Sequence, residues 1–324
     1  MARIVDLDPA TYVEHATHLG ERSWAETNCY TDVVIELLHG MGLEPYAAMA
    51  FTLSVGWDVD QWTFFKFHPA DIETLYARTL VELAPWRPLH LHIHDQVAAG
   101  RPVLVELDSF FLPDTQGTAY KLAHVKSTVA VNEIDVDKGM MGYFHNQSYH
   151  RLSGDDFRDV FQTEGLVHDR MLPPYIEFLR ALPDRTPLVG DARTAASLAQ
   201  LKRELGRLPT VNPLRTFRDK LVEDIDWLRT QDLEMFHTYS FATLRQYGSC
   251  FELASGYLRW LGEQGVDGLT PAADDLLAIS QSAKAMQFQL ARAMMRKRAL
   301  KLDALDAQAE RWESAMDLLR ARFA

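Results

Sequence analysis

The sequence predicts an α+β fold, in which a mixed N-terminal part is followed by a helical C-terminal part. Residues 1 to about 180 contain helix-like and strand-like stretches separated by turns, whereas the chain after about 190 has long helical periodicity. Between them, LPDRTPLVGD (182–191) carries two prolines and a glycine, which is typical of a linker. We therefore expect an α+β domain over residues 1–185 and a helical domain over residues 190–324.

The N-terminal elements are predicted from short patterns. A helix is indicated by DVVIELLHGMG (32–42) and a shorter one by HPADIETLYA (68–77). Pro69 is suited to the first position of the shorter helix. Strands are indicated by QWTFFKF (61–67), RPVLVELDSFFL (101–112), HVKSTVAVNEID (124–135) and GMMGYFHN (139–146). This order of a helix and then several strands joined by turns is what predicts the α+β class.

The C-terminal part is expected to be a bundle of about five helices. Helical periodicity runs through 191–208, 212–231, 240–264, 270–299 and 302–323, with prolines and glycines between these segments. Cys250 lies within the third of them and is expected to pack in the core.

Composition and charge disfavour several classes of function. Hydrophobic residues make up 47% and charged residues 24% of the chain, which is ordinary for a folded domain. The formal net charge of −12 disfavours nucleic-acid binding. Because the chain has no apolar run near the roughly 18 residues of a membrane helix, and no signal-peptide pattern at its start, we expect a cytoplasmic protein that binds neither membrane nor nucleic acid.

Cys29 lies where a polar stretch turns into the apolar helix of residues 32–42. Asn28 is a favoured N-cap residue, so Cys29 is expected at the first helical position. There the helix dipole and the free backbone N–H groups stabilise a thiolate and can hold a developing oxyanion. The alternative is that Cys29 is a small buried side chain without a chemical role.

A thiolate nucleophile also needs a histidine as base and a third group that orients the histidine. His124 begins one predicted strand, and Asn146 ends the next one. Neighbouring antiparallel strands bring the start of one beside the end of the other, so these two residues are expected to be adjacent. The order of cysteine, histidine and asparagine along the chain is also the order in papain-like thiol enzymes.

Four stretches within residues 20–150 carry a more specific resemblance: NCYTDVVIELLHGMGLEPYAAMAFTLSVGWDVDQWTFFKF, AAGRPVLVELDSFFLPDT, HVKSTVAVNEID and GYFHN. They resemble an uncharacterised bacterial domain family that is similar to the papain-like N-terminal domain of the butirosin-biosynthesis acyltransferase (BtrH-like). The resemblance implies a papain-like fold, with Cys29 as nucleophile, His124 as base and Asn146 as the orienting residue.

The resemblance also implies a reaction and its partners. The reaction is the transfer of an acyl or aminoacyl group from a carrier-protein thioester to a small-molecule amine, with the phosphopantetheine arm of the carrier protein as donor and no other cofactor bound. The helical domain has apolar faces that could cover the active-site cleft of the papain-like domain, pair with a second subunit in a homodimer, or both.

The expected oxyanion donor is the backbone N–H of Cys29, helped by Asn28 or Trp24. Papain-like enzymes often carry a glutamine in the neighbourhood where Trp24 stands. His145, on the opposite face of its strand from Asn146, is an alternative partner for the cysteine.

Further residues are candidates for binding substrates. Asp108 and Asp114 bracket SFFLP and could contact a substrate ammonium group, although such aspartates are often turn residues. Lys126, on the same strand face as His124, could hold an acidic group, and His145 lies nearby. A cluster of basic residues, which could dock an acidic carrier protein or simply be a solvated helix face, consists of Arg292, Arg296, Lys297, Arg298 and Lys301.

The stretch LHLHIHD (89–95) alternates histidines, as a metal site on a strand would. It is better interpreted as a helix from about Pro88 to Ala99 that Gly100 ends. On a helix, His90 and His94 share a face while His92 points away, and two histidines make only half a zinc site. We therefore expect no metal.

Three functions remain open from the sequence. The first is the cysteine acyltransferase described above. The second is a cysteine peptidase or amidase on the same fold, in which water replaces the amine. The third is a non-catalytic binding protein that has kept a papain-like domain.

Overall fold

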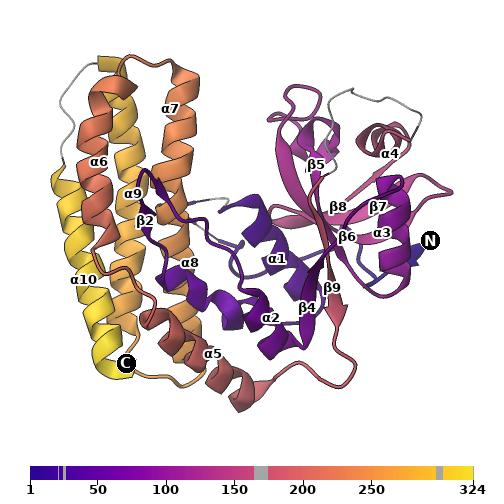
Figure 1. The fold of residues 1–324 in the computed structure, drawn as a ribbon, viewed down its shortest axis with the longest axis horizontal. Coiled ribbons are helices and arrows are strands. Elements are labelled where there is room, and N and C mark those ends of the chain that lie inside the picture. The colour runs from indigo at the N-terminus through magenta and orange to yellow at the C-terminus, as the bar shows by residue number, and fades with distance from the viewer. Residues whose placement is uncertain (21, 25–26, 164–173, 297–301, 324) are drawn as a thin grey trace. The chain divides into compact units, whose positions relative to one another are not determined.

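The computed structural model describes residues 1–324 apart from 21, 25–26, 164–173, 297–301 and 324 (Figure 1). The chain forms two compact units, which we call the sheet unit and the helical unit. The sheet unit consists of Met1–Leu19, Asn28–Pro45 and Pro69–Leu188, and the helical unit of Gly20–Thr27, Tyr46–His68 and Val189–Ala324. The expected α+β class is confirmed, because a mostly antiparallel sheet in the N-terminal part is followed by helices in the C-terminal part.

The sheet unit is built on a seven-stranded sheet of order β4–β9–β5–β6–β7–β8, with β1 also paired to β6. The pairs are antiparallel. The strands are β1 (Ala2–Arg3), β4 (Arg78–Glu82), β5 (Val103–Asp108), β6 (Lys126–Asp135), β7 (Met140–His145), β8 (Ser148–Ser153) and β9 (Ile176–Ala181).

Helices cover both faces of this sheet. Helix α1 (Cys29–Gly40) packs on β6 and β7, whereas α3 (Leu89–Ala98) packs on β6 from the opposite face and α4 (Asp155–Phe161) packs on β8. Strand β6 is accordingly buried at every position after Lys126, as a strand covered on both faces must be. At the end of α1, a Cβ on Gly40 would lie 2.6 Å from the Phe144 ring, so glycine allows this close approach.

The sheet unit also contains short helical segments. They are α2 (Pro69–Tyr76) and the 3₁₀ turns η2 (Ser109–Phe111) and η3 (Pro113–Thr115). Helix α2 begins at Pro69 as the sequence predicts, and α3 ends before Gly100, whose φ of 78° is left-handed. The two 3₁₀ turns lie in the loop between β5 and β6.

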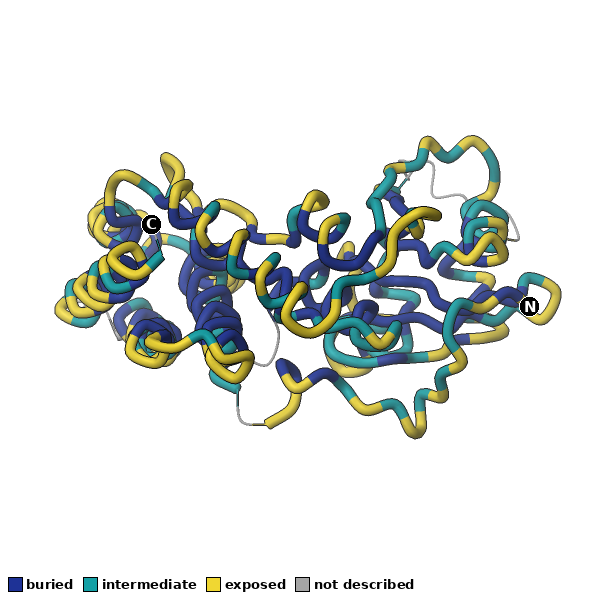
Figure 2. The backbone as a smooth tube through the Cα atoms, turned by 90° about the horizontal axis from the view of Figure 1, so that it is seen from below, coloured by how far each residue is buried: buried dark blue, intermediate teal, exposed yellow. Residues whose placement is uncertain are grey.

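The helical unit contains α5 (Gly190–Leu205), α6 (Pro213–Leu228), α7 (Leu233–Ser240), α8 (Gln246–Glu263), α9 (Thr270–Arg296) and α10 (Asp303–Phe323). It also takes in most of η1 (Pro45–Leu53) and the hairpin of β2 (Trp57–Asp58) and β3 (Gln61–Trp62). Its helices each have a buried and an exposed side, as amphipathic periodicity requires (Figure 2). No helix in the described ranges has both the length and the apolar character needed to cross a membrane.

Two details of the predicted elements were wrong. The strand predicted over 61–67 is limited to Gln61–Trp62, because the residues that follow pack as a loop, with the Phe65 and Phe67 rings against Phe51. The predicted start of a helix at residue 240 misses α7, which a π-helical turn over Phe241–Arg245 joins to α8.

Candidate functional site

Cys29 stands at the first position of α1, as the sequence predicts. Asn28 is the N-cap, and its side chain accepts a hydrogen bond from the Thr31 backbone N–H at 2.8 Å. Cys29 is partly exposed, and its Sγ lies 3.7 Å from Thr128 Oγ1 on β6. Cys29 is thus held at a helix N-terminus that faces the sheet, where backbone N–H groups favour negative charge.

The contact with Thr128 defines which residues of the sheet share a face with Cys29. Thr128 is paired with Glu106 of β5, and Lys126 is paired with Asp108. Because side chains alternate along a strand and paired residues point the same way, these four side chains lie on the α1 face. Lys126 Nζ donates to Glu106 Oε1 at 2.7 Å, and the Lys126 side chain is 71% exposed. A substrate could therefore reach Lys126, as the sequence predicts.

His124 lies just before β6 and is bound to Asp108. Its Nδ1 is 2.6 Å from Asp108 Oδ2, and the ring of Phe110 stacks on the imidazole at a centroid distance of 4.3 Å. The His124 side chain is 57% exposed. A carboxylate at Nδ1 fixes the orientation and the tautomer of the imidazole ring.

The structure does not place Asn146 at His124. Asn146 lies in the turn between β7 and β8 with a left-handed φ of 50°, and within the described residues no hydrogen bond joins it to His124. Asp108, which the sequence offered as a substrate ligand, occupies the orienting position instead. His124 and Cys29 are likewise not hydrogen-bonded to each other in the described part of the chain.

Tyrosines and a buried glutamate extend the polar face beside Cys29. Tyr30 OH donates to Glu177 Oε1 at 2.5 Å, and Tyr175 OH donates to Glu177 Oε2 at 2.9 Å. Burial raises the pKa of both phenols, with Glu177 adding to the effect, so both hydroxyls stay protonated as donors. Glu177 follows two residues after Tyr175, whose backbone carbonyl accepts from the Glu106 N–H at 3.0 Å.

A buried ionic cluster fixes the start of α1 from its other side. His18 Nε2 lies 3.1 Å from Asp32 Oδ1, while His18 Nδ1 contacts Glu36 Oε1. These three side chains are completely buried. Burial acts to lower the pKa of His18, but hydrogen bonds with the two carboxylates outweigh it, and the pKa is raised. An imidazolium therefore bridges two carboxylates one and two turns after Cys29.

This cluster was not predicted from the sequence, although the spacing of its two carboxylates could have indicated it. Asp32 and Glu36 are spaced i, i+4 on an apolar helix, where two like charges destabilise the helix unless a cation lies between them. A buried position for both implies a cationic partner, and His18 provides it.

Of the predicted oxyanion donors, Trp24 already has partners within the helical unit. Its indole Nε1–H donates to Ser280 Oγ at 3.0 Å, and its backbone N–H donates to Glu252 Oε2 at 3.2 Å. The Asn28 amide oxygen is used as the helix cap. The backbone N–H of Cys29 thus stays the first choice of the expected donors.

His145 and Asp114 lie on the other face of the sheet from Cys29. His145 is 1% exposed, with Nδ1 2.5 Å from Asp114 Oδ2 and Nε2 2.7 Å from Ser127 Oγ. Both ring nitrogens are occupied, which leaves no group of His145 for the predicted substrate contact. Asp114 is also buried and paired, so it does not face a substrate ammonium group.

The histidine stretch forms helix α3, as predicted. His92 Nε2 accepts from the Trp86 and Arg87 backbone N–H groups, and His94 contacts Asp95. Burial lowers the pKa of His90, which packs beside Phe157. Within the described ranges, no group of three histidine, cysteine, aspartate or glutamate side chains is arranged to hold a metal ion.

The remaining predicted residues belong to the helical unit. Arg292 is exposed on α9, and Arg296 ends that helix, whereas Lys297, Arg298 and Lys301 lie outside the described residues. Cys250 is fully buried in α8, as expected, with Sγ 3.4 Å from the Thr52 carbonyl, and burial raises its pKa well above the ordinary value. It is thus a core residue.

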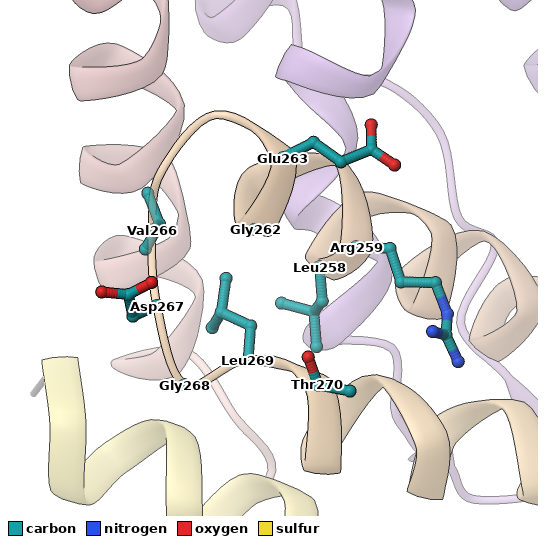
Figure 3. Close-up of a pocket in the computed structure, with 9 residues that line it drawn as sticks. All are labelled: Leu258, Arg259, Gly262, Glu263, Val266, Asp267, Gly268, Leu269 and Thr270. Atoms are coloured by element: carbon teal, nitrogen blue, oxygen red, sulfur yellow. The ribbon is translucent and has the colours of Figure 1, made fainter.

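A cavity of about 390 Å³ lies where α8 turns into α9 (Figure 3). Arg259, Glu263 and Asp267 line it with apolar neighbours. Arg259 Nη2 is already bound to Asp274 at 2.5 Å. None of the residues that the sequence singled out for chemistry lines this cavity.

The fold and the site define an α+β protein whose candidate nucleophile begins a helix packed on an antiparallel sheet. The chain belongs to the DUF1839 family: residues 13–181 match the DUF1839 N-terminal domain and residues 190–321 match the DUF1839 C-terminal domain. No curated protein matches the chain.

Proposed function

We propose that this protein is a cysteine-dependent acyltransferase with a papain-like arrangement of its nucleophile and base. Cys29 takes an acyl or aminoacyl group from a carrier-protein thioester and passes it to an amine. The observation that carries the proposal is the placement of Cys29 at the first position of α1, partly exposed, on the sheet face that also bears the His124–Asp108 pair.

In the first step, the Cys29 thiolate attacks the thioester carbonyl of the donor. The backbone N–H groups at the start of α1 stabilise the oxyanion, and the new bond is an acyl–Sγ thioester. The phosphopantetheine thiol leaves and takes a proton from the His124 imidazolium.

In the second step, an amine attacks the acyl–Cys29 carbonyl. His124 accepts the proton that the amine loses, the C–Sγ bond breaks, and Cys29 leaves as a thiolate. Glu106 lies on the same sheet face and is partly exposed, and a carboxylate there suits the recognition of an ammonium group before it is deprotonated. This carboxylate supports an amine as the acceptor.

Transfer of the proton requires His124 to approach Cys29. His124 precedes Thr128 by four residues, which is about 13 Å between Cα atoms of an extended chain. Its side chain is exposed, and the catalytic contact forms as substrate fills the space between the two residues. Asp108 orients the imidazole in this arrangement, the role that the resemblance assigns to Asn146.

The test is the intact-protein mass after incubation with a panel of acyl- and aminoacyl-pantetheine thioesters. Wild-type protein is expected to gain the mass of the acyl group, Cys29→Ala to gain none, and Cys250→Ala, the matched control, to behave as wild type. Added amine acceptors are then expected to remove the adduct as an amide.

Other outcomes would replace the proposal. Loss of the adduct to water at a rate that amines do not change would indicate a cysteine peptidase or amidase. No adduct, together with a Cys29 that alkylates as slowly as Cys250, would indicate a non-catalytic binding protein.

A further inference from the structure

A chain of buried hydrogen bonds lies behind the candidate site, on the face of the sheet opposite α1. Asp114 Oδ2 is 2.5 Å from His145 Nδ1, and His145 Nε2 is 2.7 Å from Ser127 Oγ. Tyr143 OH donates to the other carboxylate oxygen of Asp114 at 2.5 Å. A carboxylate only accepts, so His145 Nδ1–H is the donor to Asp114.

The order serine, histidine, aspartate matches that of a serine nucleophile with its base and orienting acid. The burial of these three side chains rules out a serine nucleophile here. Ser127 is 8% exposed, and the side chains of His145 and Asp114 are 1% and 6% exposed. A nucleophile must be open to a carbonyl carbon, and this hydroxyl is enclosed between the sheet and the loop that follows β5.

The hydrogen bonds instead anchor one loop to the sheet. Asp114 stands in the middle of the loop of residues 109–125, whereas Tyr143 and His145 belong to β7. The loop directly follows Asp108 and contains His124, so its two ends carry the pair of the candidate site. The Ser109 backbone N–H donates to the Val125 carbonyl at 2.8 Å, which closes the loop.

The same loop provides the surroundings of His124. Phe110 stacks on the imidazole, and the Lys121 backbone N–H donates to the Phe110 carbonyl at 3.0 Å. Near its middle, the loop is attached to the sheet through Asp114. Burial acts to raise the pKa of Asp114, but the hydrogen bond with His145 and the other contacts outweigh it, and the pKa is lowered. The anchor is therefore ionised at neutral pH.

We propose that Asp114 is a positioning residue for the cysteine chemistry, because its bonds to His145 and Tyr143 hold the 109–125 loop in the form that joins His124 to Asp108. The proposal rests on the proposed function, since it assumes that His124 supports the Cys29 thiolate.

The test compares wild type with Asp114→Asn in the rate at which an acyl-pantetheine thioester acylates Cys29, read by intact-protein mass, and in the rate of Cys29 alkylation by iodoacetamide, in the full chain. Asn keeps the side-chain size but has one accepting oxygen where Asp has two. We expect the acylation rate at pH 7 to fall roughly 10-fold, because the leaving thiol takes its proton from His124, and the alkylation rate, which needs no such proton, to stay unchanged. Amide hydrogen exchange within 109–125 is expected to accelerate in the same variant.

Two further variants complete the design. Glu133→Gln also removes a buried carboxylate, one paired with Arg151 at 3.1 Å and remote from the loop, and is expected to leave the acylation rate unchanged. Tyr143→Phe removes one of the hydrogen bonds to Asp114 and keeps the ring in the core. It is expected to give a smaller fall in the acylation rate, and it serves if Asp114→Asn does not fold.

The outcomes separate this inference from the proposed function. Wild-type protein that no thioester acylates at Cys29 would overturn both. A wild-type acylation rate that Asp114→Asn and Tyr143→Phe leave unchanged would overturn the role of Asp114 alone. Labelling of Ser127 by a fluorophosphonate in Cys29→Ala protein would also overturn it, by showing that the hydroxyl is an open nucleophile.

Discussion

His124 Nδ1 lies 2.6 Å from Asp108 Oδ2, where Asp108 ends β5 and His124 lies just before the start of β6. This pairing gives the exposed imidazole a fixed orientation on the face that α1 covers. It also assigns the orienting role to a carboxylate that precedes the histidine in the chain.

Asp108→Asn should therefore impair acyl transfer to Cys29. An amide can hold the wrong imidazole tautomer and does not stabilise the imidazolium, so we expect the rate of adduct formation to fall by roughly 100-fold. Intact-protein mass measured over time gives this rate. The control is Asp95→Asn, which removes another exposed aspartate–histidine contact, with His94 on α3. Equal rates in the two variants would show that Asp108 has no special role.

The His18 cluster should make the stability of the sheet unit depend on pH. Because the folded-state pKa of His18 is raised above its unfolded value of 6.5, its contribution is fully present below pH 6.5 and is lost as pH rises through the folded pKa. Hydrogen exchange of α1 amides between pH 6 and 9, corrected for intrinsic rates, would reveal this loss.

His18→Gln should remove that pH dependence and lower the unfolding free energy by about 3 kcal/mol at pH 6, since two buried carboxylates lose their cation. His94→Gln, on an exposed side chain, is the control and should change neither quantity. A pH dependence that persists in His18→Gln would assign it to another group.

Glu204 of α5 should stabilise the helical unit against acid. Burial acts to raise its pKa, but His68, Ser54 and Arg203 outweigh this and hold the pKa at about 2. Its contribution is therefore present above about pH 4.5 and lost as pH falls toward 2. Urea titrations should show Glu204→Gln to be less stable by about 3 kcal/mol at pH 7, with the difference from wild type shrinking below pH 4.5. A difference that is constant with pH would contradict this.

Two glycines of α8 should respond oppositely to alanine. A Cβ on Gly248 would lie 2.5 Å from the Trp24 ring, which Ser280 and the Lys284 ammonium hold in place. Gly248→Ala should therefore destabilise the protein by about 2 kcal/mol.

Gly262 has nothing within 4 Å of the corresponding position. Gly262→Ala should stabilise the helix by about 0.5–1 kcal/mol through backbone entropy. Thermal unfolding of both variants provides the comparison, and the same sign of change in both would refute the packing argument.

Much of the fold follows from local patterns. The period of apolar residues predicts α1, and the short apolar runs predict β5 and β6, since one or both faces of each are buried. The residues after Trp62 have strand-like aromatics, but their place is decided by packing against Phe51 of η1, which the pattern of the stretch itself does not show. The π turn before α8 joins it to α7 without a proline or glycine that would mark a boundary between the two helices.

The site was predictable only in part. An N-cap preference is local, so the position of Cys29 at the helix start follows from Asn28. The partner of His124 depends on how β5 and β6 are aligned, and pairing register between strands is not encoded in either strand alone. Asp108 consequently emerged only from the structure, whereas Asn146 proved to be a turn residue with positive φ.

The chain enters the helical unit before it completes the sheet unit, since residues 20–27 and 46–68 belong with residues 189–324. Trp62 packs against Tyr247, and the Cys250 thiol is hydrogen-bonded to the Thr52 carbonyl. The helical bundle is therefore completed by residues from the N-terminal part of the chain. The helical unit cannot be completed by residues 189–324 alone. Cutting the gene near codon 188 should yield two fragments that are poorly folded apart and that regain structure when co-expressed, in the manner of a split protein.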